Sequence, residues 1–124
     1  MSESVLLLNE EEFLKMENWF IKNNYASPEH LQSGWGVRFV DFKVVKDIIL
    51  KNGSFNLIIS NDFKKKESTL TTFIKDAKGY EQDIKDFTFD SISEFNSKLS
   101  FYKKKLSEEN GTVQAINWII HRLG

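Results

Sequence analysis

The sequence predicts an α+β domain, in which helices pack on one face of an antiparallel sheet, and three patterns indicate this class. Apolar residues at helical spacing occupy the first part of the chain, alternating apolar residues run from Trp35 to about Phe89, and helical spacing returns after Ser91. Strands grouped between helices are typical of an antiparallel sheet with helices on one face. The 124 residues contain no internal repeat and no linker-like segment. We therefore expect an N-terminal helix, four to five strands in two hairpins and two C-terminal helices, in one globular domain over residues 1–124.

The N-terminal helix is predicted by a start signal and an apolar stripe. Asn9 can cap it, and Glu12 stands three residues later as the capping-box partner. The apolar side chains at helical spacing are Phe13, Leu14, Met16, Phe20 and Ile21. Asn23-Asn24 should end the helix, and Ser27-Pro28-Glu29 predicts a single helical turn within a loop. Val5 to Leu8 fit either a short strand or an apolar lead-in.

A first hairpin is predicted where Lys51-Asn52-Gly53-Ser54 separates two apolar runs, because Asn-Gly between such runs is the strongest local hairpin signal. The run after it alternates cleanly at Phe55, Leu57 and Ile59. For residues 44–50 a helix ending at Gly53 also fits the spacing. We favour a strand there, because the segment is dense in β-branched residues.

A second hairpin is predicted around Lys75 to Gly79, between Leu70 to Ile74 and Tyr80 to Phe87. In its second arm, alternation places Tyr80, Gln82 and Ile84 on one face, with Ile84 pointing into the core. Glu81, Asp83 and Lys85 then share the face that meets water or a partner. Residues Asn61 to Ser68 are expected to form a polar connection between the two hairpins.

Two C-terminal helices follow. Ser91-x-x-Glu94 is a capping box, and the stripe after it is Ile92, Phe95, Leu99, Tyr102 and Leu106. Asn110-Gly111 should stop this helix, and Thr112 can cap the last one. The last stripe is Val113, Ile116, Ile120 and Leu123. Trp118 and Ile119 lie off that stripe, so this helix is either buried on two sides or exposes an apolar edge.

The composition excludes several chemistries. The chain has no Cys, so thiol nucleophiles, disulfides and thiolate metal ligands are absent. Its two histidines, His30 and His121, have no orienting carboxylate near them in the sequence, and Gly34-Trp35-Gly36 lacks the third glycine of a phosphate loop. We therefore expect no catalytic residues, no metal site and no cofactor.

The chain is expected to be cytoplasmic. The absence of Cys fits a reducing compartment. Met1-Ser2-Glu3-Ser4 lacks the positive start of a secretory signal, and the apolar run Val5 to Leu8 is too short to cross a membrane. We therefore expect no membrane association. The oligomeric state cannot be predicted from these patterns.

Three alternative functions have some support in the sequence. Asp83-Ile84-Lys85 with Asp62 upstream has the acid-x-Lys pattern of a metal-dependent nuclease. The runs Lys64–Lys66 and Lys103–Lys105, with Trp35 and Phe39 as stacking residues, would suit single-stranded nucleic acid. The net charge of −1, and six Glu against two Lys in residues 1–33, disfavour that partner. A small-ligand pocket lined by Phe87, Phe89 and Trp118 is the third alternative.

The candidate partner-binding residues cluster around the second hairpin: Asp76, Tyr80, Glu81, Asp83 and Asp86. Carboxylates around an exposed aromatic anchor are typical of a protein interface. The alternative for each residue is a solubilising surface that protects the edge of a sheet.

In general type, this compact, Cys-free, aromatic-rich and mildly acidic chain resembles the small cytosolic immunity proteins that neutralise bacterial toxins, including those of contact-dependent inhibition systems. The resemblance is one of composition and transfers no residue. It implies a cognate toxin as the partner, for example a nuclease, which the chain would occlude.

Overall fold

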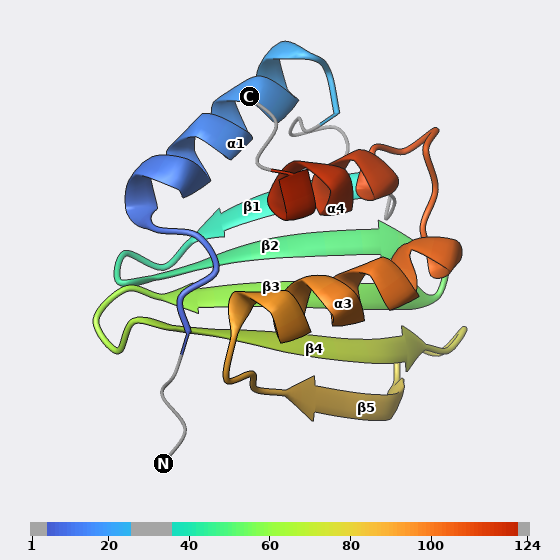
Figure 1. Cartoon of the computed structure of the whole chain (residues 1–124). Helices are drawn as coiled ribbons and strands as arrows, with labels where there is room; N and C mark the ends of the chain where they lie inside the picture. Colours follow the sequence, from blue (N-terminus) through green and yellow to red (C-terminus); the bar gives the residue numbers. More distant parts are fainter. Residues whose placement is uncertain (1–4, 26–35, 122–124) are drawn as a thin grey trace.

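The computed structural model describes residues 5–25 and 36–121, and it confirms the predicted α+β class. The helices are α1 (Glu10–Lys22), α3 (Ile92–Tyr102), the 3-10 helix η1 (Lys103–Lys105) and α4 (Thr112–His121). The strands are β1 (Gly36–Asp41), β2 (Val45–Asn52), β3 (Phe55–Asp62), β4 (Glu67–Lys75) and β5 (Glu81–Phe87). All five strands pair antiparallel in the order β1-β2-β3-β4-β5, and α1, α3 and α4 lie over one face of the sheet (Figure 1).

Helix α1 begins at the predicted capping box. The Glu12 backbone N–H donates to Oδ1 of Asn9 at 2.8 Å, and the Asn9 N–H donates to Oε1 of Glu12 at 3.1 Å. The buried stripe is narrower than the sequence predicted, because Leu14 and Ile21 are 45% and 53% exposed. The buried members are Phe13, Met16 and Phe20. Leu14 and Ile21 are seven residues apart, so they share a flank of the helix that no described element covers.

The first predicted hairpin is formed by β2 and β3. Asn52 pairs with Phe55, so Gly53 and Ser54 make a two-residue turn, and Gly53 has a φ of 63°. Residues 45–52 form a strand that is paired on both sides, which decides against the helical alternative for 44–50. Every second side chain of β2 faces the core, and Ile48 and Leu50 are fully buried there.

The connection between β3 and β4 is shorter than the polar connection predicted over Asn61 to Ser68. Strand β3 runs through Asp62 and β4 begins at Glu67, so only residues 63–66 form the turn. Asn61 and Ser68 pair across the two strands and are both buried. Their side chains hydrogen-bond each other, so these polar residues lie inside the sheet.

The second hairpin forms as predicted, but the alternation along β5 is broken. Thr72 pairs with Lys85 and Ile74 pairs with Gln82, so two β5 residues lie opposite the single residue Phe73. The extra residue makes a β-bulge at Asp83, which has a φ of 53°. As a result, Ile84 does not point into the core, as the alternation predicted, and is 56% exposed.

The two C-terminal helices form, but the first is shorter than predicted: α3 ends at Tyr102 and η1 ends at Lys105, whereas Asn110-Gly111 was expected to stop this helix. Oγ of Ser91 accepts the N–H of Glu94 at 3.2 Å and caps α3. Helix α4 is buried on two sides, since Trp118 and Ile119 are both buried and the Trp118 ring lies 5.4 Å from that of Trp19 on α1. The segment Ser27-Pro28-Glu29 and the residues His30, Gly34, Trp35 and Leu123 lie outside the described residues.

None of the described helices covers the second face of the sheet (Figure 1). The side chains on that face alternate with the buried ones along each strand, and they include Ile49, Ile58 and Phe73. We call this surface the open face. The side chains of Ile49, Ile58 and Phe73 are half-buried.

Candidate functional site

Strand β5 differs from the other strands in its burial. Six of its seven residues are exposed, whereas β2 and β4 alternate between buried and half-buried positions. Tyr80, directly before the strand, is 67% exposed. The predicted site residues Glu81, Asp83 and Asp86 are all exposed, as the sequence predicted. This strand therefore offers side chains to solvent from both of its faces.

Asp76 has a structural role in the turn before β5. Its Oδ1 accepts the N–H groups of Lys78 and Tyr80, both at 2.9 Å, and its Oδ2 accepts the side-chain amide of Gln82 at 2.7 Å. The hydrogen bond from the Tyr80 N–H is the largest cause that lowers the pKa of Asp76, with smaller contributions from Gln82 and Lys78. The carboxylate is thus occupied by the hairpin itself, and it holds Tyr80 in place.

Asp86 lies at the other end of β5 and belongs to the open face. Its Oδ1 accepts the hydroxyl of Thr71 at 2.7 Å, and Thr71 is its cross-strand partner. Asp83 forms an exposed ion pair with Lys85, with Oδ2 and Nζ 3.8 Å apart. The five predicted residues therefore have three different roles. Asp76 stabilises the turn, and Asp86 belongs to the open face. Tyr80, Glu81 and Asp83 form one exposed group. We call this last group the β5 edge site.

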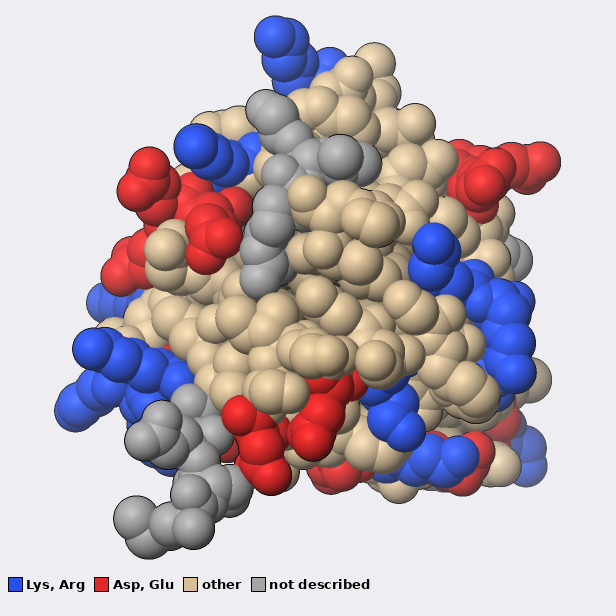
Figure 2. Space-filling view, in the orientation of Figure 1, with Lys and Arg blue, Asp and Glu red and all other residues tan. Residues whose placement is uncertain are grey.

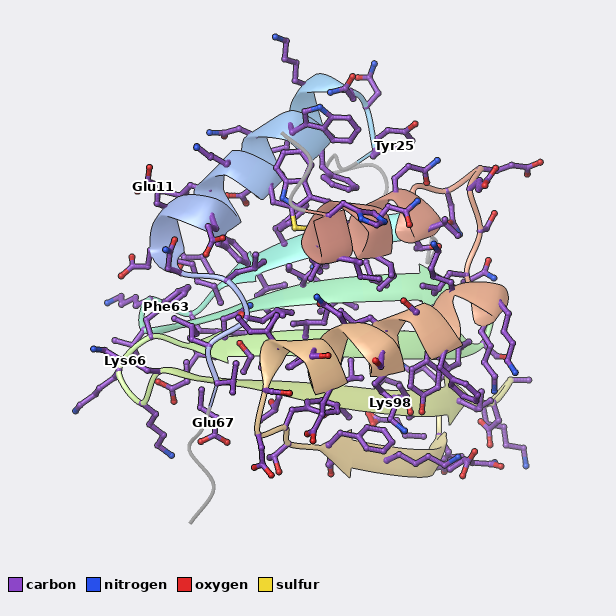
Figure 3. All side chains as sticks on the ribbon, viewed as in Figure 1. Glu11, Tyr25, Phe63, Lys66, Glu67 and Lys98 are labelled. Carbon is purple, nitrogen blue, oxygen red and sulfur yellow. The ribbon has the colours of Figure 1, made fainter. Side chains whose placement is uncertain are left out.

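A shallow depression of about 540 Å³ lies between the outer side of α3 and the connection from β5 to α3, and the sequence did not predict it. Its lining residues are Thr88, Phe89, Ser93, Glu94, Ser97, Lys98 and Phe101. Lys98, labelled in Figure 3, places Nζ 4.6 Å from the centre of the Phe87 ring. Among the described residues, those that line this depression include no histidine, and His121 is at the end of α4. The only sequence signal was Ser93 and Ser97, spaced four residues apart on a polar helix face.

The residues of the nuclease pattern, Asp62 and Asp83, do not lie close together in the structure. Asp62 pairs across β3 and β4 with Glu67, whereas Asp83 lies opposite Phe73, six residues further along β4. At about 3.4 Å per residue these carboxylates are about 20 Å apart, too far to share a metal ion. Within residues 5–25 and 36–121, no group of three or more His, Asp or Glu side chains is placed to hold a metal.

The two lysine runs lie at opposite ends of the sheet. Lys64–Lys66 form the turn between β3 and β4, near the labelled Phe63 and Lys66 in Figure 3, whereas the carbonyl of Lys105 accepts a hydrogen bond from Asn52 at the far end of β2. On the helix-covered face, Lys and Arg lie at separate places around the rim (Figure 2). Phe39 is half-buried, with its ring 5.5 Å from that of Phe13, so it is not a free stacking platform.

The expected small-ligand pocket is not formed by its three residues. Trp118 packs against α1, where its ring lies 6.2 Å from that of Phe20. Phe87 and Phe89 stack on each other at 6.2 Å, and Phe89 lies 4.5 Å from Phe95 on α3. The tryptophan and the two phenylalanines therefore belong to different parts of the core.

Comparisons with family models, with curated proteins and with solved structures find no match for this chain. In the part of the chain that the structure describes, every helix is too short or too polar to cross a lipid bilayer.

Proposed function

We propose that this chain is a non-enzymatic protein-binding domain and that it contacts its partner through the β5 edge site. The supporting observation is the exposure of β5, in which six of seven residues face solvent. Tyr80 is 67% exposed, and the hydrogen bond from its backbone N–H to Asp76 holds it in position. An aromatic residue on a fixed backbone beside carboxylates is the arrangement that interface hot spots favour, because less backbone conformational entropy is lost on binding.

The kind of partner follows from the charges around Tyr80. Glu81 pairs in register with Lys75, and Asp83 lies 3.8 Å from Lys85, so acidic and basic groups alternate along this edge. An alternating pattern selects a partner by matching individual charges, which contributes more to specificity than to affinity. Such specificity is what a protein that neutralises one cognate toxin requires. We therefore favour an immunity protein that occludes a bacterial toxin as the biological role.

The test begins with the protein in its native host, where a tagged copy is cross-linked and the retained partner is identified and purified. Binding is then measured by calorimetry, and inhibition of the partner's activity is measured in parallel. The test variant is Glu81→Lys with Asp83→Lys. The matched control is Glu108→Lys with Glu109→Lys, because these exposed residues lie before α4 and give the same change in charge.

The proposal expects that the wild type and the control bind the partner alike and inhibit it. The β5 edge variant should bind about tenfold more weakly or worse, and Tyr80→Ala should do the same. The proposal is wrong if the wild type binds no protein that it inhibits. It is also wrong if the β5 edge variant and the control lose equal affinity.

A further inference from the structure

The open face carries one row of residues that crosses all five strands. Arg38 on β1 pairs with Ile49, Ile49 with Ile58, Ile58 with Thr71, and Thr71 with Asp86 on β5. The row therefore has a cation at one edge of the sheet, an anion at the other edge, and two isoleucines and a threonine between them. Arg38 forms no ion pair with any residue in the described ranges 5–25 and 36–121.

The neighbouring charges on either side of β3 follow the same division with two exceptions, and Asp62 adds an anion on β3 itself. Lys51 lies on β2 beside Arg38, whereas Glu67 on β4 and Glu81 on β5 lie on the side of Asp86. Asp47 on β2 and Lys75 on β4 are the exceptions. The β1 side of the open face is thus mainly basic and the β5 side mainly acidic.

We propose that the open face binds a second copy of this chain, with the two sheets stacked face to face about a two-fold axis that runs nearly parallel to β3. That axis exchanges the two edges of the sheet, so Arg38 of each copy meets Asp86 of the other, and the two Ile58 side chains meet on the axis. A two-fold axis across the strands would instead set Arg38 against Arg38. Only the axis along β3 makes the surface complementary to itself, which is the requirement of an isologous dimer. The small angle of about 30° between stacked sheets keeps Arg38 within reach of the facing carboxylate.

The size of the open face is sufficient for a weak dimer. Five strands at about 4.8 Å spacing span about 24 Å, and the 8 residues of β3 span about 27 Å. The footprint is therefore roughly 600 Å² on each copy, somewhat below the 800 Å² or so that a stable interface covers. We expect a dimer that forms and dissociates with concentration.

This inference goes beyond the proposed function, because it uses the Asp86 end of β5 and the centre of the sheet rather than Tyr80. Sedimentation velocity over a range of concentrations gives the dimer dissociation constant from the rise toward twice the 14.5 kDa mass of the chain. Arg38→Asp and Asp86→Arg should each raise that constant about tenfold or more, and the two changes together should restore it. The matched control is Lys64→Asp, which makes the same charge change in the turn between β3 and β4 and should leave the dimer intact.

A second pair of variants tests the centre of the face. Ile58→Lys places two cations on the axis and should abolish the dimer, whereas Val44→Lys, at a 54% exposed position off the face, should not. Circular dichroism confirms that each variant folds. A wild type that remains a monomer at every concentration overturns the inference, and so does a double variant that dimerises no better than Arg38→Asp alone.

Discussion

The hydroxyl of Ser68 donates a 2.7 Å hydrogen bond to Oδ1 of Asn61, and both side chains are buried between β3 and β4. Asn61 Nδ2 in turn donates to the carbonyl of Lys46 on β2 at 3.2 Å. Oγ of Ser68 accepts the N–H of Leu7 at 2.8 Å, and the Ser68 N–H donates to the carbonyl of Val5. This small polar network therefore ties the segment before α1 to three strands.

Removing the hydroxyl of Ser68 should destabilise the fold. Ser68→Ala leaves Oδ1 of Asn61 and the N–H of Leu7 without their partner in a buried place, which costs about 1–3 kcal/mol of unfolding free energy. Urea unfolding measures the change. The control is Ser60→Ala, one residue before Asn61 on the open face, which should change the free energy by less than about 0.5 kcal/mol. Equal losses in the two variants would contradict the role of the network.

Gly111 is required by its conformation and by its close contact with Tyr25. Its φ is +81°, and a Cβ there would lie 2.7 Å from Cδ1 of the Tyr25 ring. Gly111→Ala should therefore lose about 2 kcal/mol or more, from backbone strain together with steric overlap. Gly79→Ala is the matched control, because Gly79 has a φ of +88° with nothing within 4 Å of an added Cβ. Thermal unfolding should show a smaller loss for the control, and an equal loss would exclude the contact with Tyr25 as a cause.

The elements that the sequence predicted well depend on neighbours within a few residues. The caps at Asn9 and Ser91 need only a backbone N–H three residues away, and the turn at Gly53 needs only its own left-handed φ. The buried pairing of Asn61 with Ser68 depends on the register of separate strands. Because both residues are polar, the local pattern indicated a loop instead.

The candidate site was predicted only in part, because it too depends on contacts between residues that are far apart in the sequence. Tyr80, Glu81 and Asp83 are exposed as expected, but Asp76 and Asp86 have other roles. The bulge at Asp83 has no local signal, since a non-glycine residue with positive φ is uncommon and requires support from the surrounding fold. The relation between Arg38 and Asp86 requires the order of all five strands, which no local pattern contains.

The carboxylate of Asp76 should make the stability of the hairpin depend on pH. Its folded-state pKa lies below the ordinary value of 3.8, so the unfolded chain takes up the proton first as pH falls. The stabilisation is fully present above 3.8 and is lost as pH falls through the lower folded-state value. Asp76→Asn cannot titrate, so its stability deficit relative to the wild type should shrink over that window. Unfolding at a series of pH values measures this, and a constant deficit would contradict the assignment.

Glu17 on α1 should have the opposite effect on stability. Burial is the main cause that raises its pKa, Asp41 raises it further, and the positive charge of Lys46 partly offsets both. Because the folded state holds the proton where the unfolded chain has lost it, stability falls as pH rises from 4.5 through the raised value. Glu17→Gln should therefore be more stable than the wild type at neutral pH and equal to it below 4.5.

Lys46→Met removes the positive charge that partly offsets the raised pKa of Glu17. In a chain that keeps Glu17, this variant should therefore lose stability more steeply as pH rises. The control combines Lys46→Met with Glu17→Gln. If the unfolding free energy of this double variant depends on pH in the same way as that of Lys46→Met alone, the interaction between Lys46 and Glu17 is not electrostatic.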